Sequence, residues 1–262
     1  MISQQMNRKQ LFYILLIGIG VGFLSGLFAV GGGMIIVPAL ISIVGFSPRL
    51  AAGTSLTAII PLSLVGVISY AIDENVSWSA AGLLSVGAIV GSQIGTWLLT
   101  KISQKGIQIF FTCFLVVIIL MMFIHVPNRN SSFQISLYVC IALIFVGFVV
   151  GILSGFLGIG GGGIIVPILM LVFGTSDLLA KGTSLLMMVL AALSGSVSNM
   201  RRGNLDPKVA LLIGIPACIV TPLGTMVAKY ISPQTSNLLF AGFLLFILLK
   251  MIRNILQTPK SK

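Results

Sequence analysis

The sequence predicts an all-α polytopic membrane protein built as a tandem repeat, and three observations support this prediction. The 262 residues are 57% hydrophobic and only 7% charged, with a mean hydropathy of +1.17, whereas a soluble domain carries about 25% charged residues. Apolar runs recur along the chain at lengths near the roughly 20 residues that cross a bilayer core. One glycine-rich stretch also occurs twice. These observations exclude a soluble globular domain.

Eight long apolar runs are expected to form transmembrane helices, and two short runs are expected to form half-helices set off by glycines. At about 1.5 Å per residue, neither short run comfortably crosses a core of about 30 Å. The long runs cover residues 11–30, 50–72, 80–100, 107–124, 135–157, 178–199, 209–228 and 236–256, and the short runs cover 34–46 and 164–174.

The repeat is read from two copies of the glycine-rich stretch. Residues 21–40 are VGFLSGLFAVGGGMIIVPAL and residues 150–169 are VGILSGFLGIGGGGIIVPIL, with thirteen of twenty positions identical and no gap. The same offset of 129 residues aligns GTSL at 53–56 with GTSL at 182–185. We therefore expect a first repeat with its N-terminal tail over 1–124, a linker loop over 125–133, and a second repeat with a basic C-terminal tail over 134–262.

The loop charges predict that the two repeats are inverted. If each short segment returns to the side where its preceding helix began, and the N-terminus is cytoplasmic, twelve of the fifteen Lys and Arg fall inside. Only Arg129, Lys181 and Lys229 fall outside. The other arrangement gives a split of ten to five, so the positive-inside rule favours the first. Both termini are then cytoplasmic, and one glycine tip approaches the midplane from each side, as in inverted-repeat transporters.

Three consecutive glycines in the first copy and four in the second form the predicted substrate site. Consecutive glycines adopt positive φ and let successive backbone N–H groups form an anion-binding nest. The short helix that follows directs its free N–H groups and positive dipole end to the same point, with Pro38 or Pro167 in its first turn. Close helix packing is the alternative use of glycine. The predicted contacts are Gly31, Gly32, Gly33, Gly160, Gly161, Gly162 and Gly163.

The paired GTS triplets supply the other predicted substrate contacts. Each triplet lies near the start of the helix that follows a short segment, where a hydroxyl can donate to an anion. Bonding to the preceding turn or to another helix is the alternative. The predicted contacts are Thr54, Ser55, Thr183 and Ser184.

The remaining polar residues of the apolar runs are given structural roles. Ser25 and Ser154 lie between glycines and are assigned to helix packing, and Lys181 is expected to snorkel to the outer interface. The acids are expected in loops or at helix ends, so no carboxylate is predicted inside the membrane to relay protons or bind sodium. They are Asp73, Glu74, Asp177 and Asp206.

Composition and spacing also argue against several other classes of protein. The net charge of +11 comes from Lys and Arg in short connections and at the termini, a pattern typical of topology signals and of contact with anionic lipids rather than nucleic acid. One histidine and three isolated cysteines give no metal-ligand spacing, and we expect no metal, no cofactor and no enzymatic activity. Gly158-x-Gly160-x-x-Gly163 lacks the strand and the acidic residue of a dinucleotide site.

The doubled small-residue helix ending in GGG or GGGG, then IIVP, then GTSL, resembles the sulfite exporter TauE/SafE family, grouped with the toluene-sulfonate uptake permeases. The similarity covers residues 11–256. The resemblance implies a bacterial or archaeal inner-membrane permease for small sulfur-containing anions such as sulfite or organosulfonates, in exchange with or coupled to an ion gradient.

The predicted function is therefore a secondary membrane transporter, a permease or exporter, that works by alternating access at the glycine-rich helix breaks. A passive anion channel with the same glycine-lined constriction is the first alternative. A membrane enzyme and a scaffold subunit are the others, and both are disfavoured. The expected partners are a small anionic substrate and a bilayer with anionic lipids, and the sequence allows a homo-oligomer.

Overall fold

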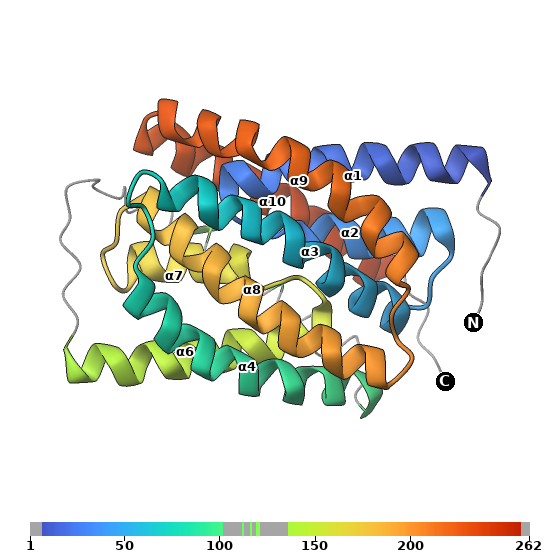
Figure 1. Ribbon diagram of the computed structural model, residues 1–262, viewed down its shortest axis with the longest axis horizontal. Coiled ribbons are helices and arrows are strands. Elements are labelled where there is room, and N and C mark those ends of the chain that lie inside the picture. The colour runs from blue at the N-terminus through green and yellow to red at the C-terminus, as the bar shows by residue number, and fades with distance from the viewer. Residues whose placement is uncertain (1–6, 102–111, 113–115, 117–118, 121–135, 258–262) are drawn as a thin grey trace.

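The computed structural model describes residues 7–101, 112, 116, 119–120 and 136–257 (Figure 1). Within these residues every regular element is a helix, which confirms the all-α prediction. The elements are α1 (Arg8–Phe28), α2 (Gly33–Ala39), a π-helical turn (Leu40–Val44), α3 (Pro48–Ala71), α4 (Trp78–Lys101), α6 (Leu137–Leu157), α7 (Gly162–Leu171), α8 (Asp177–Arg201), α9 (Pro207–Tyr230) and α10 (Pro233–Gln257).

Six of the described helices are long and apolar enough to cross a membrane, namely α1, α3, α4, α6, α8 and α9. The expected span over 236–256 is present as α10, whose apolar part, Pro233–Leu249, is shorter than these six. Most of the run over 107–124 and all of the linker over 125–133 lie outside the described residues. The two short runs are α2 with its π-helical turn and α7, each beginning at a glycine.

Polar side chains cap the N-termini of α3, α8 and α9. The Ser47 and Ser176 hydroxyls accept hydrogen bonds from the N–H groups of Leu50 and Leu179, which satisfies one of the free donors at each helix start. The Asp206 carboxylate caps α9 in the same way, ahead of a proline at its first position.

The prolines of the short helices lie deeper than predicted. Because α2 begins at Gly33 and α7 at Gly162, Pro38 and Pro167 are each the sixth residue and fall in the second turn, not the first. A proline there removes one backbone hydrogen bond and crowds the preceding turn. In the first repeat the chain widens into the π-helical turn directly after Pro38.

Reciprocal contacts relate the two repeats. Under the offset of 129 residues, α1, α2, α3 and α4 correspond to α6, α7, α8 and α9. Helix α1 packs along α9, and its counterpart α6 packs along α4, while α3 and α8 pack on each other between these two pairs (Figure 1). Each contact has its partner under exchange of the repeats, so an approximate two-fold relation connects the halves.

Glycines allow the helices of the two outer pairs, α1 with α9 and α4 with α6, to pack closely. Gly18, Gly22 and Gly26 of α1 lie directly against backbone of α9, so a Cβ added at Gly22 would be 2.3 Å from the Ala217 carbonyl oxygen. The counterparts Gly147, Gly151 and Gly155 meet α4 in the same way. Such contacts replace the hydrophobic driving force, which does not act between helices in lipid.

The same contacts give the relative direction of the helices. Residue numbers rise together along α1 and α9, from Gly18 beside Ile213 to Gly26 beside Thr221, so these helices run parallel. Along α3 and α8 they run in opposite senses: the Thr57 hydroxyl bonds the Ser196 hydroxyl at 3.1 Å, and Gly66 lies beside Leu185. Helix α3 is therefore antiparallel to its counterpart α8.

Burial places the core at the crossing of α3 and α8 and leaves the outer surface apolar. Ile59 and Met188, one from each helix, are 0% exposed. By contrast the outward face of α9 carries large exposed apolar residues one turn apart: Leu211, Ile215, Ile219 and Leu223. An apolar exterior of this extent fits a lipid environment.

We expect Gly22→Ala to destabilise the protein by about 1–3 kcal/mol, because the added methyl would overlap the Ala217 backbone. Gly20→Ala on the same helix is the matched control, since no atom lies within 4 Å of the added Cβ. It is expected to be neutral or to stabilise the helix by roughly 0.5–1 kcal/mol. Thermal unfolding of the detergent-solubilised variants measures both, and equal midpoints would contradict the packing role of Gly22.

Candidate functional site

Each glycine stretch is the tip of a helical hairpin. The Gln10 side-chain amide, at the start of α1, donates a 3.1 Å hydrogen bond to the Ile43 carbonyl, so the short segment returns to the side where α1 began. In the second hairpin, Gly161 packs back onto Val150 of α6, as its counterpart Gly32 packs onto Val21 of α1. The predicted return of the short segment is confirmed for the first repeat, and the second tip folds back onto its preceding helix in the same way.

The two tips meet at the centre of the protein. Gly33 lies against the carbonyl of Gly158, and Gly162 lies against the carbonyl of Ala29. Ile59 of α3 and Met188 of α8 each contact both Gly31 and Gly160. All seven predicted glycines are buried, and a Cβ would press on neighbouring atoms at every one of them. The structure therefore brings the two predicted halves of the site into one place.

The backbone at the tips holds donors that the protein does not use. Gly31 and Gly32 have φ of 74°, and Gly160 and Gly161 have φ of 85° and 86°, a left-handed conformation that turns successive N–H groups toward one side. The Gly31 N–H donates to the Ser25 hydroxyl at 3.2 Å. At the second tip, no hydrogen bond joins the N–H groups of residues 160–163 to another described residue. Buried N–H groups without a partner are rare in proteins.

Ser25 therefore does more than allow close helix packing, which was the role predicted from the sequence. Its hydroxyl is fully buried and accepts from the tip backbone. The tips themselves, Ala29–Gly33 and Gly158–Gly163, contain no charged side chain. An anion at this point would therefore be met by N–H dipoles and helix N-termini rather than by a fixed cation.

The serines of the GTS triplets reach the tips of the opposite repeat. The Ser55 hydroxyl donates to the Gly158 carbonyl at 2.8 Å, and the Ser184 hydroxyl donates to the Ala29 carbonyl at 3.5 Å. These bonds hold each tip against the helix that it crosses, so both serines lie beside the glycines, and their role as substrate contacts stays a prediction.

The threonines of the same triplets hold loops. The Thr54 hydroxyl accepts a 3.0 Å hydrogen bond from the Asp206 N–H, and the Thr183 hydroxyl accepts one of 3.0 Å from the Ser77 N–H. Thr54 thus fixes the connection between α8 and α9, and Thr183 fixes the connection between α3 and α4, each in the other repeat. Their role as substrate contacts stays a prediction.

Lys181 was expected to snorkel to the outer interface, and this prediction is wrong. Lys181 and Asp177 are each 1% exposed, with the ammonium nitrogen 3.5 Å from the carboxylate oxygen. The ammonium also donates to the Ser236 hydroxyl of α10 at 2.6 Å. The spacing of four residues between Asp177 and Lys181 on one helix was the sequence signal that could have predicted this ion pair. Asp177 does begin a helix, as predicted, but it is a buried carboxylate.

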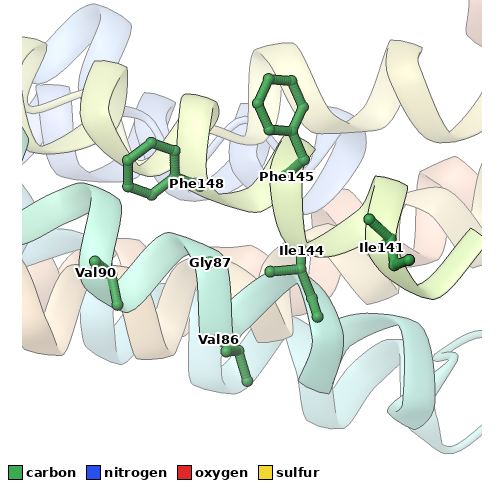
Figure 2. Close-up of a pocket in the computed structure, with 7 residues that line it drawn as sticks. All are labelled: Val86, Gly87, Val90, Ile141, Ile144, Phe145 and Phe148. Carbon is green, nitrogen blue, oxygen red and sulfur yellow. The ribbon is translucent and has the colours of Figure 1, made fainter.

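An apolar groove on the outside of the protein lies between α4 and α6 (Figure 2). It has a volume of about 370 Å³, and Gly87 lets the two helices approach closely at its floor. Its lining offers no side chain that can bind an anion, so it is not the candidate site. The lining residues are Val86, Gly87, Val90, Ile141, Ile144, Phe145 and Phe148.

Paired helical hairpins whose tips meet inside a bundle of membrane-spanning helices are the architecture of a membrane transporter. A family model described as sulfite exporter TauE/SafE matches residues 3–122 and 143–262. The chain belongs to this family, and it is a membrane transporter protein.

The relatives of the chain carry the same general description. It is 27% identical over 262 residues to the probable membrane transporter protein YunE of Bacillus subtilis, covering 89% of this chain and 94% of the relative. A probable membrane transporter protein of Methanocaldococcus jannaschii is 28% identical over 258 residues, covering 90% and 94%. One of Haemophilus influenzae is 28% identical over 259 residues, covering 93% and 97%. No solved structure matches the chain.

Replacement of Lys181 by Met is expected to destabilise the protein by about 3–5 kcal/mol, because it leaves the Asp177 carboxylate buried without its cation. Lys229→Met is the matched control. Lys229 pairs with Asp73, and their side chains are 29% and 45% exposed, so about 0–1 kcal/mol is expected. Thermal unfolding in detergent measures the difference. Similar losses of stability in both variants would show that the buried Lys181 pair contributes no more to stability than the exposed Lys229 pair.

Proposed function

We propose that this protein is a secondary transporter of small sulfur-containing anions, such as sulfite or organosulfonates, and that the glycine tips bind the substrate. The observation that carries the proposal is the set of buried N–H groups at the tips that have no partner among the described residues. The description of the family as sulfite exporters supports the substrate class.

The chemistry of the tips fits a small oxyanion. Each sulfonate or sulfite oxygen accepts hydrogen bonds, and an N–H donor at a helix N-terminus stabilises negative charge. Glycine at every position lets the ligand approach the backbone itself. Ser55 and Ser184 hold the tip carbonyls from the opposite repeat, which orients the N–H groups. Binding without a fixed cation also favours release, which a transporter needs.

The proposal includes two repeats inverted in a bacterial or archaeal cell membrane, with both termini cytoplasmic. The antiparallel course of α3 and its counterpart α8 supports inversion. The charges support the orientation. Asp73 pairs with Lys229 at one end, whereas Arg49 bonds the Thr100 carbonyl at the other, where most of the Lys and Arg gather.

Alternating access would arise from rocking of the hairpins about the α3–α8 crossing. In the structure the tips press on each other, Gly33 on Gly158 and Gly162 on Ala29, and both are buried. Because the contacts are reciprocal, opening at one hairpin has an equivalent opening at the other. A substrate bound between the tips would thereby face one side of the membrane at a time.

A passive channel of the same architecture is the competing function. Direct contact between the tips favours a transporter, since the pathway at the centre is closed by backbone. Counterflow separates the two, because internal anion accelerates uptake through a carrier and not through a channel.

Gly32→Val and Gly161→Val are expected to reduce sulfite uptake into proteoliposomes more than about tenfold, because each side chain would strike a valine at positive φ and deform the tip. Uptake of radiolabelled sulfite, with and without internal sulfite and with and without an imposed pH gradient, measures the effect. Gly82→Val is the control, since nothing lies within 4 Å of its Cβ. Normal flux in well-inserted tip variants would remove the glycines from the site.

The inverted arrangement is tested by single cysteines in a background without native cysteines. Glu74→Cys and Arg202→Cys lie in corresponding exposed connections of the two repeats. In intact cells, a membrane-impermeant maleimide is expected to label Glu74→Cys and to reach Arg202→Cys only after the membrane is opened. Labelling of both variants from one side would exclude inversion.

A further inference from the structure

The two glycine tips differ in how their neighbouring serine hydroxyls are used. Ser25 and Ser154 correspond under the offset of 129 residues, and both are at most 1% exposed. The Ser25 hydroxyl accepts from the Gly31 N–H at 3.2 Å. The Ser154 hydroxyl makes no hydrogen bond within the structure. The approximate two-fold relation is therefore broken at this point.

Ser154 lies next to Gly161 of the second tip. Its Cβ is 3.7 Å from the position that a Cβ would take at Gly161. The N–H groups of Gly160 to Gly163 also have no hydrogen-bond partner among the described residues, and they lie at the start of α7, a helix of ten residues that begins at Gly162. One hydroxyl and several N–H groups thus gather as unused donors around a single helix N-terminus.

Another buried hydroxyl without a partner among the described residues, that of Ser63, lies on α3 one helical turn from Ile59, which packs on both Gly31 and Gly160, so Ser63 belongs to neither tip in particular. Its counterpart in the second repeat is Ala192. At the first tip the Gly31 N–H is already engaged with Ser25, so this tip offers one backbone donor fewer than the second tip, although the N–H groups of Gly32, Gly33 and Met34 also have no partner among the described residues. The two tips therefore differ in one serine hydroxyl and one backbone donor, both of which are unused only at the second tip.

We infer that Ser154 is a substrate ligand and that, with the N–H groups of the second glycine tip, it makes this tip the tighter half of the binding site. This inference rests on the proposed function. The ligand class is a small oxyanion with several acceptor oxygens. One oxygen accepts a hydrogen bond from the Ser154 hydroxyl, while the others accept hydrogen bonds from backbone N–H groups. At the first tip Ser25 already holds the Gly31 donor, so this tip offers the oxyanion no free serine hydroxyl and one N–H group fewer.

Ser154→Ala and Ser25→Ala form a matched pair for testing the inference with sulfite as the probe. We expect Ser154→Ala to keep the thermal unfolding midpoint of the sulfite-free protein, because no protein partner is lost. It should raise the apparent KM for sulfite by about tenfold or more, the loss of one hydrogen bond to a charged group, while kcat changes little. Ser25→Ala should lower the sulfite-free midpoint, because the buried Gly31 N–H loses its acceptor.

The outcomes separate this inference from the proposed function. If the wild-type protein takes up sulfite and Ser154→Ala keeps its KM, the inference fails alone. It also fails if Ser154→Ala lowers the sulfite-free midpoint as far as Ser25→Ala does, since the hydroxyl then has a structural partner. If the wild-type protein, folded in vesicles, neither takes up sulfite nor shifts its midpoint with it, the sulfur-anion proposal and the inference fail together.

Discussion

The constraint on which this structure depends is the need of every backbone N–H and C=O for a partner where no water is at hand. Helices meet it along almost the whole described chain. At the two glycine tips the helices stop, and the structure protects the exposed backbone by burying one tip against the other. Ser55 and Ser184 bond the carbonyls of the facing tips. Most of the remaining N–H groups at the tips have no partner among the described residues.

The same constraint explains why the two repeats pack so closely against each other. A tip that is half satisfied by the opposite repeat needs that repeat to be held at close range. Glycines along α1 and α6 bring backbone against backbone on α9 and α4, and the threonines of the GTS triplets fasten the loops across the two-fold relation. The helix packing and the glycine tips are consequently held together by contacts between the two repeats.

Departures from the two-fold relation are few and local. The buried pair of Asp177 and Lys181 has Pro48 and Ala52 as its counterparts, so only one end of the protein ties α8 to α10 through a buried charge. The π-helical turn follows α2 and not α7. Ser154 lacks the bond that Ser25 makes.

The sequence by itself determined the class of protein, the positions of the described helices and the residues of the glycine tips. These properties depend on apolar run length and on the repeat, both of which are local or periodic signals. The predictions were wrong for Lys181, Pro38 and Pro167 and incomplete for Ser25, because these environments depend on a neighbouring segment or on the residue at which a helix begins. Only the tertiary structure decided that the two tips touch, that Ser55 and Ser184 cross to the opposite repeat, and that Ser154 is left without a partner. Contacts between residues more than a hundred positions apart follow from the packing of helices, which no local pattern encodes.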